Sequence, residues 1–234
     1  MNNVLVITGA SRGIGLAAAE RFAAEGYRVI NLSRQRPVLH AVEHLATDLT
    51  DMQWPQQQAE PLRQLLQNAD RICVIHNAAL LAKDSIGDVS AESFQQVLQL
   101  NVIAASQLNQ LVLPLMKSGS SILYVSSTLG EKAVANTCSY ATSKHAQIGL
   151  MRATCQDLIG QGIHTVAVCP GFTDTEMLRD HIGNDAEALD YFAGLCSFNR
   201  LLEPGEIADT LWFCAHSPAL NGAVIHANLG QIER

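Results

Sequence analysis

The sequence predicts an α/β fold: a doubly wound parallel sheet with helices on both faces, in three layers. Short apolar runs alternate with longer segments rich in Ala, Leu, Gln and Glu, in which apolar residues recur at intervals of three and four. Strand, helix and strand in repeated succession are typical of a parallel sheet that is covered on both faces. The chain has 234 residues without a linker, internal repeat or low-complexity tract, so we expect 1–234 to form a single domain.

Six apolar runs are predicted to be strands, and four longer segments are predicted to be helices. The strands are Val4 to Ile7, Arg28 to Leu32, Arg71 to Ile75, Ser121 to Val125, His164 to Cys169 and Ala223 to Ala227. The helices are Ile14 to Glu25, Ala91 to Met116, Ser139 to Ile159 and Pro204 to Ala215. Gly26 follows the first helix as a left-handed stop, and Pro204 suits the first turn of the last helix. We interpret Gln56 to Gln58 as a surface connection.

Composition limits the classes of function. The 15 Lys and Arg residues against 22 Asp and Glu residues give a formal charge of -7, which repels polyanions, so nucleic-acid binding is not expected. No apolar run approaches the roughly 18 to 20 residues that cross a bilayer. We therefore expect neither a membrane anchor nor a signal peptide, and a cytoplasmic location. The six cysteines are scattered without a CxxC pair, which indicates reduced thiols and no metal site.

A glycine-rich turn follows the first predicted strand and leads directly into a helix. It reads Thr8-Gly9-Ala10-Ser11-Arg12-Gly13-Ile14-Gly15. Glycines permit a tight turn and close backbone approach, and the helix N-terminus offers N–H groups and a partial positive charge to a pyrophosphate. The spacing GxxxGxG differs from the GxGxxG dinucleotide fingerprint, and a tight connection without a ligand is the alternative reading.

The end of the second predicted strand indicates which dinucleotide is preferred. Enzymes that prefer NAD place a carboxylate about 20 residues past the glycines, whereas an arginine there accommodates the 2′-phosphate of NADP. This chain has Ser33 followed by Arg34, and Arg12 in the glycine turn is a second candidate partner of that phosphate. The pattern favours NADP(H). The alternative is that both arginines face solvent.

The middle of the chain holds a candidate acid-base group. Tyr140 and Lys144 are four residues apart and hence on one helix face. A free tyrosine has a pKa of about 10, and a neighbouring ammonium lowers that pKa by favouring the phenolate. Ser127 follows the strand Ser121 to Val125 and can donate a hydrogen bond to a reacting carbonyl oxygen. Either motif alone has a plain structural explanation, but both together favour catalysis.

From these motifs, the chain resembles the short-chain dehydrogenase/reductase family over essentially its whole length. Seven landmarks occur in the family's order, which is more specific than any one of them. They are the glycine turn Thr8 to Gly15, Asp48-Leu49, Asn77-Ala78, Asn101, Ser127, the pair Tyr140 and Lys144, and Pro170-Gly171.

The resemblance implies a Rossmann-type sheet that binds NADP(H), with NAD(H) as the less favoured cofactor and with no metal. Asp48 would accept a hydrogen bond from the adenine amino group, although a helix cap is the plain alternative for this residue. The implied cofactor contacts are Gly9, Ser11, Arg12, Gly13, Ile14, Gly15, Ser33, Arg34, Asp48, Leu49, Asn77, Ala78, Tyr140, Lys144, Pro170, Gly171, Thr173 and Thr175.

The resemblance also implies a role for each of four catalytic residues. Tyr140 would give its proton to the carbonyl oxygen as hydride arrives from the nicotinamide, and would take it back in the reverse direction. Ser127 would polarise that oxygen. Lys144 would lower the pKa of the phenol and bind the nicotinamide ribose. Asn101 would hold a water that connects Lys144 to solvent, and a core amide is the alternative for this residue.

Two departures from the family pattern are visible. His76-Asn77-Ala78-Ala79 replaces the usual Asn-Asn-Ala-Gly, and we interpret His76 as structural. The connection Gln35 to Thr47 is short, so we expect its helix to be truncated or missing and the adenine side to be more open. Residues 176–200 mix apolar and acidic side chains, which indicates either a substrate-binding lid or ordinary helical packing.

We therefore predict an NADP(H)-dependent oxidoreductase that acts on a small ketone or secondary alcohol. The alternative from another class is a non-catalytic relative that binds dinucleotide as a redox sensor or structural subunit. The resemblance further implies a homotetramer, or alternatively a dimer, formed through the long helices Ala91 to Met116 and Ser139 to Ile159.

Overall fold

The protein is described by a computed structural model that covers residues 2–39, 42–183 and 185–232. Its centre is a seven-stranded sheet in the order β3-β2-β1-β4-β5-β6-β7, and every neighbouring pair is parallel. The strands are β1 (Asn3–Thr8), β2 (Arg28–Ser33), β3 (Val42–Ala46), β4 (Arg71–His76), β5 (Ser121–Val125), β6 (His164–Pro170) and β7 (Ala223–Ala227). All six predicted strands are confirmed, and β3 is the additional one.

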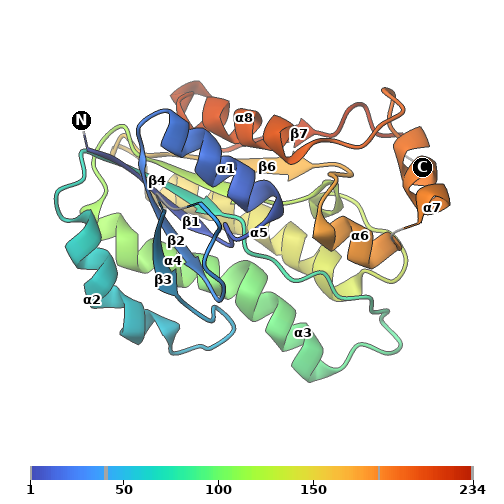
Figure 1. The fold of residues 1–234 in the computed structure, drawn as a ribbon. Coiled ribbons are helices and arrows are strands. Elements are labelled where there is room, and N and C mark those ends of the chain that lie inside the picture. The colour runs from blue at the N-terminus through green and yellow to red at the C-terminus, as the bar shows by residue number, and fades with distance from the viewer. Residues whose placement is uncertain (1, 40–41, 184, 233–234) are drawn as a thin grey trace.

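Helices cover both faces of the sheet, as the sequence predicts (Figure 1). On one face α1 (Gly13–Ala24) packs against α8 (Pro204–Ala215). The other face carries α2 (Trp54–Leu66), α3 (Ala91–Leu98), α4 (Ala104–Val112) and α5 (Cys138–Asp157). Two short helices, α6 (Glu176–Ile182) and α7 (Ala186–Gly194), lie beyond the end of β6.

Two apolar cores form because the strands between the two edge strands are buried on both faces. Leu5 and Ile7 of β1 pack with Phe22 of α1 and Leu211 of α8 on one side of the sheet. Val4 and Val6, which alternate with them, pack on the side of α2, α4 and α5. The alternation of side chains along a strand thus distributes one apolar run between two cores. The rigid sheet fixes the positions of the loops that follow its strands.

The structure corrects two sequence predictions. Gln56 to Gln58 are not a surface connection, because they lie inside α2, where Pro55 occupies the first turn and Gln58 is buried. The segment Ala91 to Met116 is not one regular helix, because a π-helical stretch, Gln99–Ile103, separates α3 from α4. π-helical turns inside α-helices frequently occur at functional sites.

Three other expectations agree with the structure. Gly26 has a φ of +82°, as the left-handed stop after α1 requires. Pro204 begins α8 with a capping box between Glu203 and Glu206. Within the described part of the connection between β2 and β3 there is no helix.

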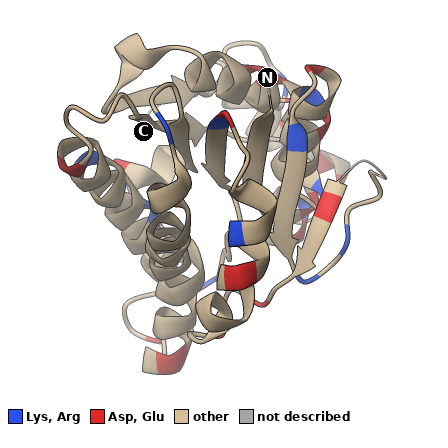
Figure 2. Cartoon of the chain, turned by 90° about the vertical axis from the view of Figure 1, so that its left-hand side faces the viewer, with Lys and Arg blue, Asp and Glu red and all other residues tan. Residues whose placement is uncertain are grey.

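The charged residues lie scattered over the elements seen in Figure 2, in agreement with the absence of a basic run in the sequence. No helix among the described residues is long and apolar enough to cross a membrane. Within 2–39, 42–183 and 185–232, no cluster of His, Cys, Asp and Glu has the makings of a metal site. All six cysteines are free thiols, and five of them are buried.

Candidate active site

The glycine turn between β1 and α1 is fastened to the two neighbouring strands. Gly9 N donates to Leu32 O at the end of β2, over 3.0 Å. The side chain of Asn77, which follows β4, donates to Thr8 O (3.1 Å) and to Gly9 O (2.9 Å). Gly9 has a φ of +73°. A Cβ atom at Gly15 would lie only 2.2 Å from Gly9 O, so this tight turn requires glycine at both positions.

The ends of β2 and β3 form the side of the site that would hold the adenosine. Ser33 donates to Gln35 O over 2.6 Å and accepts from Asn31 Nδ2 over 2.7 Å, so its hydroxyl is held in place. Arg34 is exposed beside it and lines the same pocket. No carboxylate occupies the position of Ser33, which is compatible with a phosphate there.

Asp48 lies at the mouth of this region and makes local contacts. Its Oδ1 accepts hydrogen bonds from Thr50 N (3.0 Å) and Thr50 Oγ1 (2.7 Å). These two bonds, together with the Arg34 charge, hold the pKa of Asp48 below its usual value. One oxygen of the carboxylate is therefore engaged in a local turn, not in a helix cap, because α2 begins only at Trp54, while Asp48 still lines the pocket.

Arg12 makes a contact that the sequence did not predict. Its guanidinium forms an ion pair with Glu176, the first residue of α6, and both side chains are more than half exposed. In the same place, a Cβ atom at Gly13 would lie 3.2 Å from the Thr175 side chain, which caps α6. The glycine turn thus contacts the segment 176–200 across the pocket. The Glu176 carboxylate therefore competes with any phosphate for the Arg12 guanidinium.

Tyr140, Lys144 and Ser127 meet at the floor of the pocket. Tyr140 and Lys144 lie one turn apart on α5, and Ser127 follows β5. Lys144 Nζ lies 5.5 Å from the centre of the Tyr140 ring and donates to Val125 O over 2.8 Å. All three residues line the pocket, and Lys144 is only 1% exposed.

In the chain without a cofactor, burial has the largest effect on the pKa of the phenol. Burial raises the pKa of Tyr140 to about 12, and only its hydrogen bond with Ser127 opposes that effect. Burial also lowers the pKa of Lys144 to about 7. Both shifts have one physical cause, because a low-dielectric site disfavours the charged form of each group. The ammonium donates to Val125 O and to Gln147 Oε1, which draws its protons away from the phenol.

Asn101 lies behind the pocket rather than on its wall. Its Oδ1 accepts from Leu80 N over 2.8 Å, and its Nδ2 donates to Leu80 O and to Ser143 Oγ. The side chain therefore joins the loop after β4 to α5. Its location in the π-helical stretch Gln99–Ile103 leaves the Asn101 carbonyl to accept from Gln147 Nε2, over 3.0 Å.

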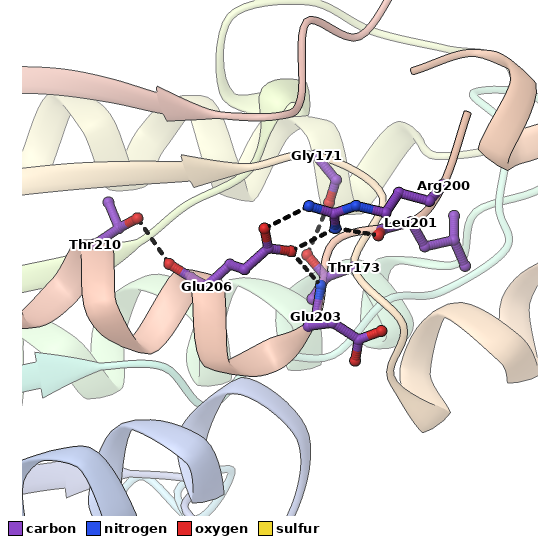
Figure 3. Close-up of polar contacts among 7 residues, drawn as sticks. All are labelled: Gly171, Thr173, Arg200, Leu201, Glu203, Glu206 and Thr210. Carbon is purple, nitrogen blue, oxygen red and sulfur yellow. Dashed lines mark hydrogen bonds and ion pairs between the residues drawn. The ribbon is translucent and has the colours of Figure 1, made fainter. Parts of the chain in front are cut away.

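The loop after β6 leads into the segment 176–200, here called the excursion, and backbone contacts join the residues on either side of it. Thr173 pairs with Leu202, and Asp174 N donates to Leu202 O over 2.8 Å. Next to Leu202, Arg200 binds both carboxylate oxygens of Glu206 over 2.7 Å, as Figure 3 shows. Glu206 also accepts from Glu203 N and thereby caps α8. The ends of 176–200 are therefore fixed to the sheet and to α8, while α6 and α7 lie between them.

One pocket of about 1110 Å³ runs along the carboxyl ends of the strands. It brings together every predicted site residue except Asn101, which lines a separate cavity of about 10 Å³. The sequence analysis did not single out several further lining residues, because they lack a chemical signature of their own. Among them are the apolar residues Leu80, Leu81, Leu129, Val134, Phe172 and Ile232. The apolar residues of 176–200 that the sequence offers for a lid also line the pocket: Met177, Leu178, Ile182, Tyr191, Phe192 and Leu195.

Comparison with known proteins decides the family. A model of the short chain dehydrogenases matches residues 3–185. The chain belongs to the short-chain dehydrogenase/reductase family. Dehydrogenase/reductase SDR family member 6 of Xenopus laevis is 34% identical over 215 residues, which cover 88% of this chain and 86% of that protein.

Solved structures of the short-chain dehydrogenase/reductase fold superpose over almost the whole chain. A short chain dehydrogenase family protein from Francisella tularensis subsp. tularensis SCHU S4 has a TM-score of 0.87 at 30% identity, and the match covers 98% of both chains. A blue fluorescent protein from a metagenomic library, solved in complex with NADPH, has a TM-score of 0.86 at 25% identity and also covers 98% of both. Membership of the family makes this chain a nicotinamide-dependent oxidoreductase.

Proposed function

We propose that the protein is an NADP(H)-dependent reductase and dehydrogenase of small ketones and secondary alcohols, with Tyr140 as its acid and base. The observation that carries the proposal is the meeting of Tyr140, Ser127 and Lys144 on the floor of one pocket with the glycine turn. A non-catalytic protein has no need of a proton donor, a hydroxyl and a buried ammonium at one place. The pocket is large enough for a dinucleotide. The glycines of the turn, which lines this pocket, carry no side chains that would keep a pyrophosphate away from the backbone N–H groups.

In the proposed reaction, the nicotinamide supplies or accepts the hydride when it is bound. Tyr140 donates its phenolic proton to the carbonyl oxygen during reduction and accepts it during oxidation, so that a ketone, one hydride and one proton become an alcohol. The Ser127 hydroxyl donates to the same oxygen and fixes its position. The Lys144 ammonium stabilises negative charge on the phenol oxygen and holds the nicotinamide ribose.

A preference for NADP(H) follows from the charges at the end of β2. Arg34 is exposed at the pocket wall, and the neighbouring position holds Ser33 in place of an acid. A 2′-phosphate thus meets a cation and no anion from these two residues. Each charge-assisted hydrogen bond contributes roughly 1.5 to 3 kcal/mol, and the exposure of the site favours the lower figure.

The substrate is proposed to be apolar, and 176–200 is proposed to be its lid. Apolar side chains from α6 and α7, among them Met177, Ile182 and Phe192, line the same pocket as Tyr140. Phe172 and Phe192 stack edge to face, with ring centres 4.8 Å apart, which joins the excursion to the loop after β6. An apolar cover excludes water during hydride transfer, as lids do in other enzymes.

A homotetramer in the cytoplasm, with a dimer as the alternative, remains part of the proposal. Of the apolar residues on the two long helical segments, Leu108, Ile148 and Met151 are buried in the chain's own core. Leu111, Leu113 and Leu150 stay partly exposed and Ile103 is exposed, so these residues are available to a second copy. Light scattering at micromolar concentration tests the assembly, and a monomeric mass excludes both forms.

The deciding experiment measures oxidation of NADPH and of NADH with a panel of apolar ketones, aldehydes and quinones. We expect turnover, and a kcat/KM with NADPH at least about tenfold that with NADH at low salt. The double variant Ser33→Asp with Arg34→Ala should reverse that order. Equal efficiency with both cofactors would contradict the NADP(H) preference, and tight NADPH binding without any turnover would favour the redox sensor instead.

A further inference from the structure

Lys144 has an unusual environment for an ammonium. It is 1% exposed, and no carboxylate forms an ion pair with it within the described residues. Nζ donates instead to two neutral oxygens, Val125 O at 2.8 Å and Gln147 Oε1 at 3.2 Å. A buried charge is costly unless such groups surround it. The two acceptors therefore decide how stable the charged form is.

Gln147 is as deeply buried as Lys144. It lies three residues after Lys144 on α5 and is 1% exposed. Its Nε2 donates to the Asn101 carbonyl over 3.0 Å. One carboxamide thus bridges the ammonium and the π-helical stretch, with its acceptor toward Lys144 and its donors toward Asn101.

Behind the bridge, on the side of Asn101, little space remains. The cavity lined by Gln147, Asn101 and His76 has a volume of about 10 Å³, which holds one water molecule at most. His76 Nδ1 has no partner within the described residues, although the other nitrogen of the ring lies 2.8 Å from Asn109 Oδ1. Gln147 therefore contacts both the Lys144 ammonium and the Asn101 carbonyl directly, through its own side chain.

We propose that Gln147, which lies between Lys144 and the Asn101 carbonyl, is a positioning residue. It holds the Lys144 ammonium in place and stabilises its charge. Gln147 touches neither cofactor nor substrate in this proposal and acts through the lysine. Its carbonyl oxygen is an acceptor that an apolar side chain of similar length does not supply. A carboxylate at the same place strengthens the interaction, because the acceptor then carries a full charge.

Other titratable groups near Lys144 do not share this geometry. Tyr140 precedes it on α5, and Cys169 approaches from β6, with Glu131 beyond the cysteine. His76 of β4 lies across the small cavity, and burial lowers its pKa to about 4, so it is neutral at pH 7. Substitution of Gln147 changes the contact with Lys144 and leaves these groups in place.

The test follows the Lys144 side chain directly in the protein without cofactor. Lysine-selective ¹³C labelling reports the titration of each ammonium through its Cε shift, and Lys144→Met assigns the signal. We expect Gln147→Leu to lower the midpoint of the Lys144 titration by about one pH unit or more, and Gln147→Glu to raise it. Packing changes alone do not produce shifts of opposite sign.

A matched control is Gln99→Leu. Gln99 is a second buried glutamine, 3% exposed, whose Nε2 donates to Leu49 O and to Gln107 Oε1. This variant should lose stability like Gln147→Leu but leave the Lys144 titration unchanged. Shifts of the same sign for both Gln147 variants, or shifts no larger than that of Gln99→Leu, overturn the proposal. If Gln147→Leu does not fold, the sign of the shift in Gln147→Glu decides.

The importance of Gln147 for turnover rests on the proposed function, whereas the titration does not. In the active enzyme, kcat should fall as the pH rises from 6 to 8, because Lys144 loses its proton. This fall should be steeper for Gln147→Leu than for the unmodified protein, while KM for the carbonyl substrate stays unchanged. A shifted titration with no turnover in any form upholds the contact and contradicts the proposed reaction. An unshifted titration with normal turnover does the reverse.

Discussion

Lys144 lies one helical turn from Tyr140, with its ammonium 5.5 Å from the centre of the phenol ring, and neither group is exposed by more than 8%. The ammonium donates to a strand carbonyl and to Gln147, not to the phenol. Its influence on Tyr140 is therefore that of a nearby charge in a low-dielectric site. Such an influence depends on Lys144 being protonated. The protonation of this lysine can be followed by its NMR titration and by the pH dependence of the free energy of unfolding.

The first prediction concerns stability. Burial lowers the pKa of Lys144 to about 7, below the value of about 10.4 in an unfolded chain. Between these values the unfolded state binds more protons, so the contribution of Lys144 to the free energy of unfolding rises with pH, whereas below pH 7 its full cost is present. Lys144→Met should therefore gain stability relative to the unmodified protein at pH 6, by on the order of 3 kcal/mol more than at pH 10.

Urea unfolding at the two pH values measures this difference without cofactor. The substitution also leaves Gln147 Oε1 without its donor, but that loss is the same at both pH values and cancels. Lys117→Met is the control, since Lys117 is exposed and donates to the Ala69 carbonyl between α2 and β4. The same difference at pH 6 and pH 10 for Lys144→Met would mean that the lysine is hydrated in solution.

The second prediction concerns the glycine turn. Gly15→Ala places a Cβ atom 2.2 Å from Gly9 O and 2.5 Å from Asn77 Nδ2, so the turn must shift. We expect NADPH affinity to fall at least about tenfold, with a lower melting temperature, because the N–H groups that face the pyrophosphate move with the turn. Calorimetric titration measures the affinity.

Gly149→Ala is the matched glycine substitution. A Cβ atom at Gly149, in α5, meets nothing within 4 Å, and alanine favours a helix over glycine by about 1 kcal/mol. This variant should keep NADPH affinity and gain stability. Equal losses of affinity in the two variants would show that the turn is not the cofactor site.

The third prediction concerns Arg12. Because Arg12 forms an ion pair with Glu176, the carboxylate competes with any phosphate for the guanidinium. Exposed ion pairs contribute about 0 to 1 kcal/mol, so Glu176→Gln should raise NADPH affinity by up to about fivefold and leave NADH affinity unchanged. Arg12→Ala should weaken NADPH selectively, but less than Arg34→Ala. If Glu176→Gln changes both affinities alike, Arg12 does not reach the 2′-phosphate.

Much of the fold could be predicted because each apolar pattern in the sequence is typical of one kind of element. Buried parallel strands are continuous apolar runs, and six of them were predicted. β3 is not an apolar run, because Val42-Glu43-His44-Leu45-Ala46 lies at the sheet edge, where polar side chains are tolerated. α2 was missed because Pro55 and the glutamines after it resemble a loop, although Trp54 and Leu62 anchor the helix in the core.

The candidate site followed equally from residues whose chemistry is specific. The glycine turn, Ser127, Tyr140 and Lys144 were predicted together, and the structure brings them to one pocket. The pairing of Arg12 with Glu176 was not predicted, because 164 residues separate the two in sequence. Gln147 was missed for another reason: a glutamine on a helix carries no signal until its burial and its contact with Lys144 are known.

The central claim is that the Tyr140 phenol transfers the proton, and Tyr140→Phe tests it most directly. The variant keeps the ring packing and removes only the transferable proton. With the best substrate of the panel, turnover should fall by about 10²-fold or more, the scale of lost general acid-base catalysis, while the dissociation constant for NADPH stays nearly unchanged. Turnover at the level of the unmodified protein would contradict the account.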